Sequence, residues 1–598
     1  MNTIKKIGIL LFATATLSSC SDYLDPWEYT LATEQKAFEL TSYLNAMPVT
    51  AYSYLPGGFN RIGNSYMTAA SDESEEVNDM EAIQMFNNGT WNKYYNPDDV
   101  WANCFKGIRI ANDYLQGTDT LTWSGLRYSN PVEYTTRMVE LTRNRGEMHF
   151  LRGMFYFELM KRYGRVPLIK DKANLIGMDL SKYPQSPVDS IVEFIVNECD
   201  LCSSRGAYAL TQSQKDTILK YNKKVLPSPY RDTVAVYYAS TGTYAGRQFR
   251  ATLGSVLALK AKALIYAASP QFNPTNNLDK WIRAANACQS VIELTTKYPT
   301  FYKQGTNYAD LFQPTTWGNW NNEYLFARKF SAFNSFDAAN FPISMKGGKT
   351  GTCPTAELVD AYEMADGTPF NWSNPAHIAA PYAGRDPRFA KTILTNGEMF
   401  NNAIAVQAYV GGDAGPGIYH ASKTGYYLKK YINQTLDLNT GKTAAKVWSV
   451  MRLSEFYLFY AEAINEAYGP DVLPIGFTLS ATAALNAVRT RASVAMPAVP
   501  SGLTQSQLRD KIIHERRIEL AFEDVRYWDL RRWKIAENFL QGEIHGVSIV
   551  KNTDGSFTYT PNVVVEKRAF DKNKMYLHPI PQYEVDRAGG ILEQNPNW

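Results

Sequence analysis

The stretch LSEFYLFYAEAINEAY, residues 453–468, decides the fold class. Apolar residues recur from Leu453 at offsets of 3, 4, 7, 8 and 11, which is the spacing of one face of an α-helix. Glu455, Glu462 and Glu466 fall on the opposite side of that helix. Gly469-Pro470 ends the pattern, because glycine commonly follows a helix and proline cannot continue one. The stretch therefore predicts an amphipathic helix.

Similar patterns recur along the chain, and several come in pairs. One pair is predicted at 251–268 and 279–297, and another at 451–468 and 480–492. Further helical patterns cover about 98–116, 133–163, 187–203 and 505–540. Such pairs resemble tetratricopeptide helix pairs, which stack into a superhelix because one pair cannot bury its apolar face alone. We therefore predict a mainly α fold with a scaffold of tetratricopeptide-like helix pairs.

Two long stretches between the helical patterns, 303–350 and 368–448, are rich in Gly, Asn, Pro and aromatic residues. Loops of this length in a compact protein are usually functional or disordered, and the aromatic content argues against disorder. No linker composition separates domains. We predict one domain over 20–598, with a helical scaffold at about 30–302 and 450–598. The long irregular loops of a variable insertion at about 303–449 would form the ligand face.

The first residues have the features of an export signal. Lys5 and Lys6 precede an uncharged, mostly apolar stretch from Ile7 to Leu17, which is too short to span a bilayer as a helix. The sequence Leu-Ser-Ser-Cys that ends at Cys20 resembles a lipobox. We predict a lipoprotein signal peptide at 1–19 and lipidation of Cys20, with more than one acyl chain, as stable anchoring requires.

Charge and cysteine usage exclude several other classes of protein. The formal net charge is +3, and removal of residues 1–19 with their two lysines brings it to +1, which argues against a nucleic-acid partner. Cys199 and Cys202 have CxxC spacing, but they lie in a helical pattern without a second pair, so we expect small buried helix residues.

We also predict no metal site and no cofactor. The acidic run Ser71–Glu76 could offer some oxygens to Ca²⁺ but lacks EF-hand spacing, so a structural Ca²⁺ is not indicated. We expect this run to be a solvated loop or to contact a polar ligand.

Several segments in order resemble the SusD/RagB family of outer-membrane nutrient-binding lipoproteins. They are Cys20–Asp25, Trp101–Leu115, Arg145–Arg152, Tyr163–Leu168, Arg452–Glu455, Tyr460–Ala463, Leu485–Arg491, Ile513–Glu523, Arg526–Trp533 and Leu577–Pro581. The resemblance spans nearly the whole mature chain, but 303–448 carries little of it.

The resemblance has functional implications. It implies a surface-exposed outer-membrane lipoprotein that binds an oligosaccharide or polysaccharide without cleaving it. It also implies a partner, a SusC-type TonB-dependent transporter, which the lipoprotein caps like a lid. Part of the family serves peptide transporters, so peptide binding remains an alternative.

The block 513–533 could also suggest a glycoside hydrolase, because paired carboxylates can perform acid–base hydrolysis. However, Glu515 and Glu519 are i,i+4 neighbours interleaved with Arg516 and Arg517, and charges in this arrangement usually neutralise one another. The remaining arginines of the block could bridge neighbouring helices through bidentate pairs. We predict a structural charge network and no catalytic residue.

Aromatic residues outside helical register are the candidates for ligand binding. They form three clusters, at 91–96, 317–322 and Phe330–Phe336. Flat rings suit the apolar face of a sugar, and amide or charged side chains suit its hydroxyl rim. The predicted ligand-binding residues are Trp91, Tyr94, Trp317, Asn319, Trp320 and Asn321. For each ring, loop packing or a contact to the transporter is the alternative.

Overall fold

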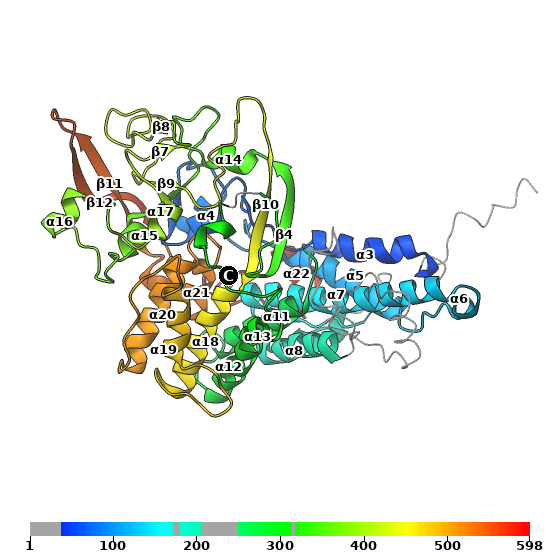
Figure 1. Cartoon of the computed structure of the whole chain (residues 1–598). Coiled ribbons are helices and arrows are strands. Elements are labelled where there is room, and N and C mark those ends of the chain that lie inside the picture. The colour runs from blue at the N-terminus through cyan, green and yellow to red at the C-terminus, as the bar shows by residue number, and fades with distance from the viewer. Residues whose placement is uncertain (1–37, 172–179, 205–248, 314–316) are drawn as a thin grey trace, which may run out of the picture.

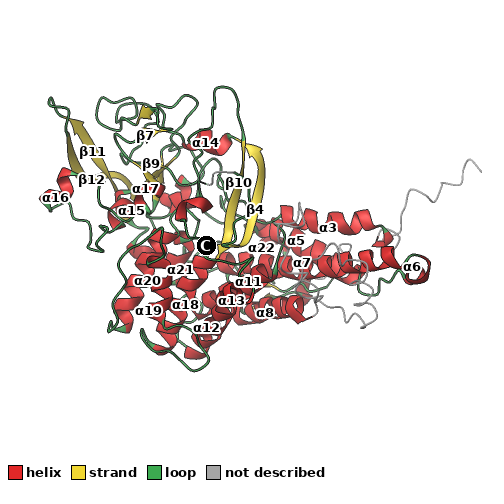
Figure 2. Ribbon diagram, in the orientation of Figure 1, coloured by secondary structure: helices red, strands yellow, loops and turns green. Residues whose placement is uncertain are grey.

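The computed structural model describes residues 38–171, 180–204, 249–313 and 317–598. Helices form an extended layer, and a part rich in loops and short strands stands on one end of it (Figures 1 and 2). The longer helices are α3 (Thr41–Ser53), α5 (Trp101–Gly117), α7 (Pro131–Tyr163), α8 (Val188–Ser204), α11 (Leu253–Ala268), α12 (Leu278–Ile292), α18 (Leu453–Tyr468), α19 (Ala481–Arg489), α20 (Gln505–Glu519) and α21 (Arg526–Arg532). The shorter helices are α4 (Gln84–Asn87), α6 (Ser124–Ser129), α13 (Leu294–Lys297), α14 (Ser335–Asn340), α15 (Ala356–Ala361), α16 (Pro375–Ala379), α17 (Phe389–Thr392) and α22 (Gln582–Arg587).

Consecutive long helices pack against one another. Helix α5 packs against α7, α7 against α8, α8 against α11, α11 against α12, and α12 against α18. Helix α18 also contacts α19 and α20. The predicted pairs at 251–297 and 451–492 are confirmed as α11–α12 and α18–α19. Capping boxes fix two helix starts, at Thr252 with Ser255 and at Thr504 with Gln507, because each supplies partners for backbone N–H groups that a helix leaves free. The mainly α scaffold is therefore as predicted.

Helix α18 lies at the centre of the scaffold and is not exposed on its acidic side. Its three glutamates are buried, and each forms an ion pair with a neighbouring helix. The pairs are Glu455–Lys262, Glu462–Arg532 and Glu466–Arg509. The periodicity identified the helix, but it could not show that α11, α21 and α20 cover the polar face.

The prediction of one continuous helix over 505–540 is wrong. Helix α20 ends at Glu519, and α21 begins at Arg526. Phe522 and Asp524 in the connecting turn have φ values of 61° and 57°, the left-handed region that side chains other than glycine rarely adopt. This turn carries the side chain of Glu523 into the charge network described below.

Every sheet of the described residues has two strands. The longest pairs are antiparallel, β4 (Tyr324–Phe333) with β10 (Ala444–Arg452) and β11 (Gly542–Lys551) with β12 (Phe557–Arg568). The remaining pairs are β1 (Ser74–Glu76) with β5 (Thr352–Pro354), β2 (Val166–Pro167) with β3 (Gln185–Ser186), β6 (Ile393–Leu394) with β9 (Tyr427–Leu428) and β7 (Met399–Phe400) with β8 (Ile404–Ala405). Strand β10 leads directly into α18, so the loop-rich part is joined to the scaffold by continuous backbone.

The region at 303–449 supplies most of a second hydrophobic cluster, which also includes residues from outside it such as Phe59 and Phe522. Phe336 is fully buried in it, and Phe330 and Phe333 pack against its edge. All three rings contact Phe59, at centroid distances of 4.8 to 6.1 Å. Phe336 therefore belongs to a core, and a ligand-binding role for that ring is wrong, whereas Phe330 and Phe333 are half-buried and their role stays a prediction.

Other expectations can be compared with the described residues. Cys199 and Cys202 are buried in α8, as predicted. The described part of the chain contains no helix that is both long and apolar enough to cross a bilayer. Within it, no three His, Cys, Asp or Glu side chains are grouped so that they could hold a metal ion. The predicted signal peptide and Cys20 lie outside the described residues.

Candidate ligand-binding site

The aromatic loop 317–322 lies between a short 3₁₀ helix (η3, Tyr308–Leu311) and β4. It borders a cavity of about 240 Å³. The lining residues are Asp310, Leu311, Trp317, Gly318, Asn319, Trp320, Asn321, Tyr324, Tyr431 and Val447. Aromatic rings and amide side chains thus surround one space, with a carboxylate as the only charged group among the lining residues.

Backbone geometry fixes the path of this loop. Gly318 has a φ of +84°, and a Cβ atom there would lie 2.8 Å from the Cβ of Ala445, so glycine is required for both reasons. The Oδ1 atom of Asn321 accepts a hydrogen bond at 2.9 Å from the backbone N–H of Glu323, the residue immediately before β4. The backbone N–H of Lys303 also donates to the carbonyl of Asn322. These two hydrogen bonds hold the loop on the C-terminal side of its tryptophans.

The two tryptophans are half-buried and are held in different ways. Trp320 packs edge-on against Tyr324 and Phe249, at centroid distances of 5.6 and 5.5 Å. Trp317 instead lies over the Nζ atom of Lys446, which is 4.2 Å from the ring centroid. Both rings are therefore supported from outside the loop.

Polar groups of the cavity can bind hydroxyls. Asn319 and Asp310 are exposed, and Asn321 is half-buried. One oxygen of Asp310 accepts a hydrogen bond from Nδ2 of Asn307 at 2.5 Å. An ionised carboxylate only accepts hydrogen bonds, whereas an amide both donates and accepts, so together they match the hydroxyls of a sugar.

The structure brings four of the six sequence-predicted residues together: Trp317, Asn319, Trp320 and Asn321. The prediction that Trp91 binds the ligand is wrong, because its ring is 1% exposed and packs between Phe86, His578 and Trp598. Its burial leaves no ring face for a ligand and removes it from the candidate site. Tyr94 is 79% exposed but does not line the cavity. Its loop is joined to α22, since the backbone N–H of Gln582 donates to the carbonyl of Lys93.

Sequence reasoning missed several residues of the site. Tyr431 and Val447 come from segments more than a hundred positions after Trp317, and no local pattern connects them to it. Asp310 and Tyr324 are nearer, and their position beside the aromatic cluster was the available signal. The pairing of β4 with β10 brings Val447 to the cavity, and the carbonyl of Tyr431 accepts a hydrogen bond from Lys446 on β10.

A larger cavity of about 560 Å³ lies elsewhere, between α5, the segment after β2 and the C-terminal residues. Its lining is dominated by apolar side chains such as Trp101, Phe105 and Ile591. The amide group in it, Asn112, is already engaged, because Nδ2 donates to the carbonyls of Ile169 and Asp171 and Oδ1 accepts from Arg152. The smaller cavity has more amide groups beside its rings, whereas the polar lining of the larger one consists mostly of the charged residues Lys106, Arg109, Asp171, Glu584 and Arg587.

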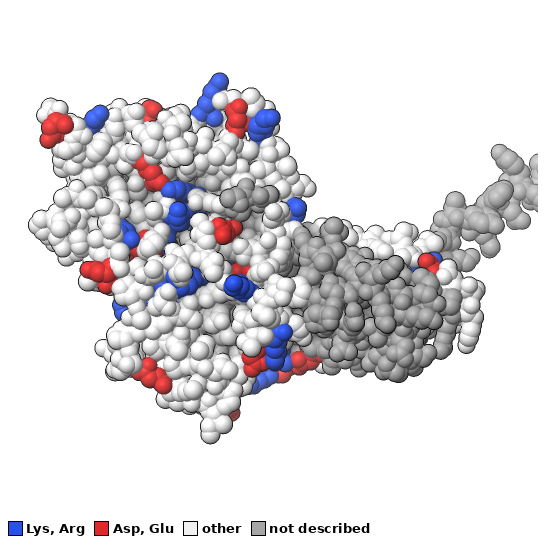
Figure 3. Space-filling model, in the orientation of Figure 1, with Lys and Arg blue, Asp and Glu red and all other residues white. Residues whose placement is uncertain are grey.

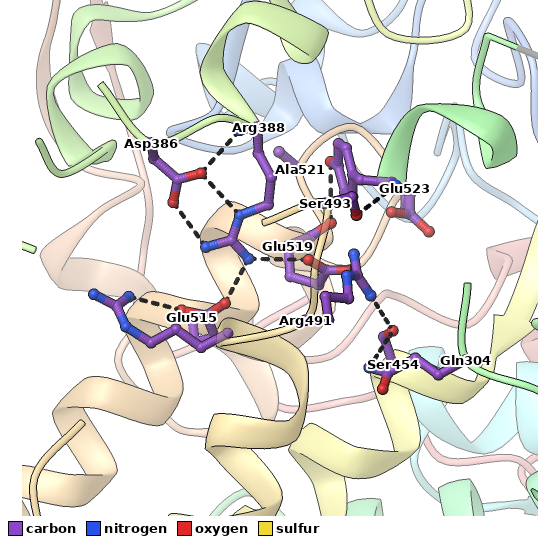
Figure 4. A network of polar contacts seen from close by, with 12 residues as sticks. Gln304, Asp386, Arg388, Ser454, Arg491, Ser493, Glu515, Glu519, Ala521 and Glu523 are labelled. Carbon is purple, nitrogen blue, oxygen red and sulfur yellow. Dashed lines mark hydrogen bonds and ion pairs between the residues drawn. The ribbon is translucent and has the colours of Figure 1, made fainter. Parts of the chain in front are cut away.

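The carboxylates of α20 belong to a buried charge network, which Figure 4 shows. Glu519 accepts hydrogen bonds from Arg388, Arg452 and Arg491 at 2.7 to 2.9 Å. Burial alone would raise the pKa of Glu519, but these arginines together hold it below its usual range. The predicted structural network is confirmed. Most of its pairs join different elements, whereas the sequence suggested pairing within one helix.

The prediction of a solvated loop at Ser71–Glu76 is also wrong, because this acidic run is buried. Asp72 forms ion pairs with Arg517 and Arg526 at 2.8 and 2.9 Å, and Glu75 forms one with Arg568 at 2.8 Å. These arginines lie more than 400 positions away in the sequence. The run ties the N-terminal segment to α20, α21 and β12, and it is not a solvated loop.

The comparisons with known proteins concern nearly the whole chain. A family model described as "SusD family" matches residues 322–598, and a second, described as "Starch-binding associating with outer membrane", matches 22–246. SusD-like protein P2 of Formosa agariphila is 30% identical over 178 residues. That match covers 29% of this chain and 30% of the relative.

Two solved structures have the same fold. A SusD-like protein from Bacteroides fragilis is 25% identical with a TM-score of 0.72, and the match covers 96% of this chain and 100% of that one. A SusD-like carbohydrate-binding protein from the same species is 23% identical with a TM-score of 0.68, over 92% of this chain and 98% of that one. Because the helix-pair scaffold, the ordered motifs and both family models agree, the chain belongs to the SusD/RagB family.

Proposed function

We propose that this protein is a non-catalytic glycan-binding lipoprotein of the outer-membrane surface. It captures an oligosaccharide or polysaccharide and delivers it to a SusC-type TonB-dependent transporter. The observation that carries the binding step is the convergence of Trp317, Trp320, Asn319, Asn321 and Asp310 on one cavity. The rings would stack on the C–H face of a sugar, and the polar groups would bind its hydroxyls.

The size of the cavity supports recognition of a short part of a glycan. Its volume of about 240 Å³ is below the roughly 300–1,000 Å³ usual for drug-sized ligands. One or two sugar rings would therefore occupy it at a time, and the rest of the chain would lie along the surface. We expect modest affinity, because sugar hydroxyls already form good hydrogen bonds to water.

Calorimetry of the purified protein against glycans tests the binding step. The panel should contain neutral and anionic glycans, because Lys and Arg side chains gather along the hollow of the face shown in Figure 3, whereas the cavity holds Asp310. Trp320→Ala should weaken glycan binding roughly tenfold, since an aromatic contact contributes about 0.5–1.5 kcal/mol beyond its area. Trp281→Phe, a conservative change at a buried scaffold tryptophan, is the matched control and should bind as the wild type does.

Two outcomes would overturn the proposal. Binding of peptides without any glycan would favour the peptide-importer alternative, and cleavage of a glycan by the purified protein would favour a hydrolase. The transporter partner and the anchor at Cys20 rest on family membership and on the lipobox. Co-purification with a TonB-dependent transporter from native membranes tests the partner.

A further inference from the structure

Trp317 differs from Trp320 in what supports its ring. Trp320 is fixed by two aromatic neighbours, whereas the ring contact recorded for Trp317 among the described residues is the ammonium group of Lys446. A ring with a cation on one face can stack on a ligand only through its other face. The position of Lys446 therefore decides how Trp317 is presented to the cavity.

Lys446 is itself held firmly. It lies on β10 with no exposed surface, and its Nζ atom is 3.0 Å from Oδ1 of Asp337, which is equally buried. Nζ also donates to the carbonyl of Tyr431 at 2.8 Å, and Tyr431 lines the same cavity. Asp337 lies on α14 and accepts a second hydrogen bond from the backbone of Asn433. The ammonium group is thus fixed by two segments other than its own strand, α14 and the segment around Tyr431.

The charge balance between Lys446 and Asp337 preserves the ability of the outward face of the Trp317 ring to attract the C–H groups of a sugar. An isolated cation would draw π-electron density from Trp317 and weaken its attraction to the C–H groups of a sugar. Asp337 offsets the charge, so the pair is neutral as a unit while the ammonium still holds the ring. Cation–π contacts are strongest when they are desolvated, and the ammonium group of this one is fully buried.

We infer that Lys446, fixed by Asp337, is a positioning residue that orients Trp317 for ligand stacking. This inference rests on the proposed function, because it assigns a role within the same site. Lys446 does not line the cavity. It acts through the ring, so its removal should matter only when the ring is present.

A double-mutant cycle tests this dependence. Lys446→Met in the wild-type background should weaken glycan affinity nearly as much as Trp317→Ala does. In the Trp317→Ala background the same change should alter affinity by less than about twofold. Lys446→Arg keeps the cation and should retain most of the affinity. Because Lys446→Met leaves Asp337 buried without its partner, the cycle is repeated with Lys446→Met/Asp337→Asn, which leaves no buried charge.

Lys430 provides a matched control. It is also fully buried, lies 2.8 Å from a carboxylate oxygen of Glu523 and places Nζ 3.9 Å from the ring of Phe312, which does not line the cavity. Lys430→Met should reduce stability without a coupling to Trp317. The inference is overturned if Lys446→Met leaves affinity unchanged, or if its effect is as large without Trp317 as with it. If Trp317→Ala itself binds glycan normally, the proposed site fails instead, which is a different result.

Discussion

Glu73 illustrates how a single buried side chain couples stability to pH. It is 1% exposed, and its Oε1 atom has no hydrogen-bond partner among the described residues. Burial, with the charge of Asp72 beside it, raises the pKa of Glu73 to about 8, although Arg526 and Arg517 act in the opposite direction. Ionisation of this carboxyl therefore costs more in the folded than in the unfolded protein.

We predict that Glu73→Gln changes the pH dependence of stability. A group whose pKa is raised on folding contributes stability below its unfolded pKa of about 4.5 and loses it as the pH rises to about 8. The melting temperature of the variant minus that of the wild type should therefore increase between pH 5 and pH 8 and stay constant above pH 8. Each pKa unit corresponds to about 1.4 kcal/mol, so the full effect is on the order of a few kcal/mol.

Glu133→Gln is the control for this measurement, because Glu133 is a surface residue at the start of α7 with its side chain 44% exposed. Melting curves from pH 5 to pH 9 should show little pH-dependent difference for this variant. A constant offset between Glu73→Gln and the wild type at every pH would contradict the prediction.

At the scale of elements, Arg452 forms ion pairs with several segments that no local sequence pattern connects to it. It lies at the end of β10 and immediately before α18. Its guanidinium group forms ion pairs with Glu323, Glu519 and Glu523, each at 2.8 Å. These carboxylates come from the loop before β4, the end of α20 and the turn before α21. The arginine therefore holds the loop-rich part and the helical scaffold together.

We predict that Arg452→Met destabilises the protein by about 3–5 kcal/mol, because it leaves buried carboxylates without a partner. Urea unfolding followed by circular dichroism should show an earlier midpoint. Arg165→Met, which removes an ion pair with Glu593 whose two side chains are 54% and 71% exposed, should cost at most about 1 kcal/mol. Equal midpoints for the two variants would show that the network contributes little.

The elements also show which parts of the structure were predictable. Periodicity and capping residues placed α11, α12 and α18 within a few positions, because these signals act over one or two helical turns. The buried state of Ser71–Glu76 could not be foreseen, because its partners Arg517, Arg526 and Arg568 are distant in sequence. For the same reason the local pattern revealed the loop 317–322 as a candidate site, while Tyr431 and Lys446 were missed. Trp91 was misjudged because exposure depends on Trp598 at the far end of the chain.

At the scale of the whole molecule, the scaffold and the loop-rich part have separate roles. The helical core is built from family motifs, whereas the cavity lies in the region that carried little of the resemblance. A family can therefore keep one scaffold while its loops change. Family membership therefore predicts the fold, which depends on the scaffold. It does not predict the ligand, which depends on the loops and has to be identified by binding measurements.

The last prediction concerns the attachment of the whole molecule to the membrane. Cys20→Ala should move the protein from the membrane fraction to the soluble fraction, because it removes the thiol to which the diacylglycerol would be attached. Cell fractionation with antibody detection measures the change, and Ser21→Ala, one position beyond the cysteine, should stay with the membrane. If Cys20→Ala remains in the membrane fraction after transporter contacts have been disrupted with detergent-free high salt, the anchor lies elsewhere in the molecule. If the variant is released and its purified form binds glycan as the wild type does, anchoring and ligand capture are independent functions of one chain.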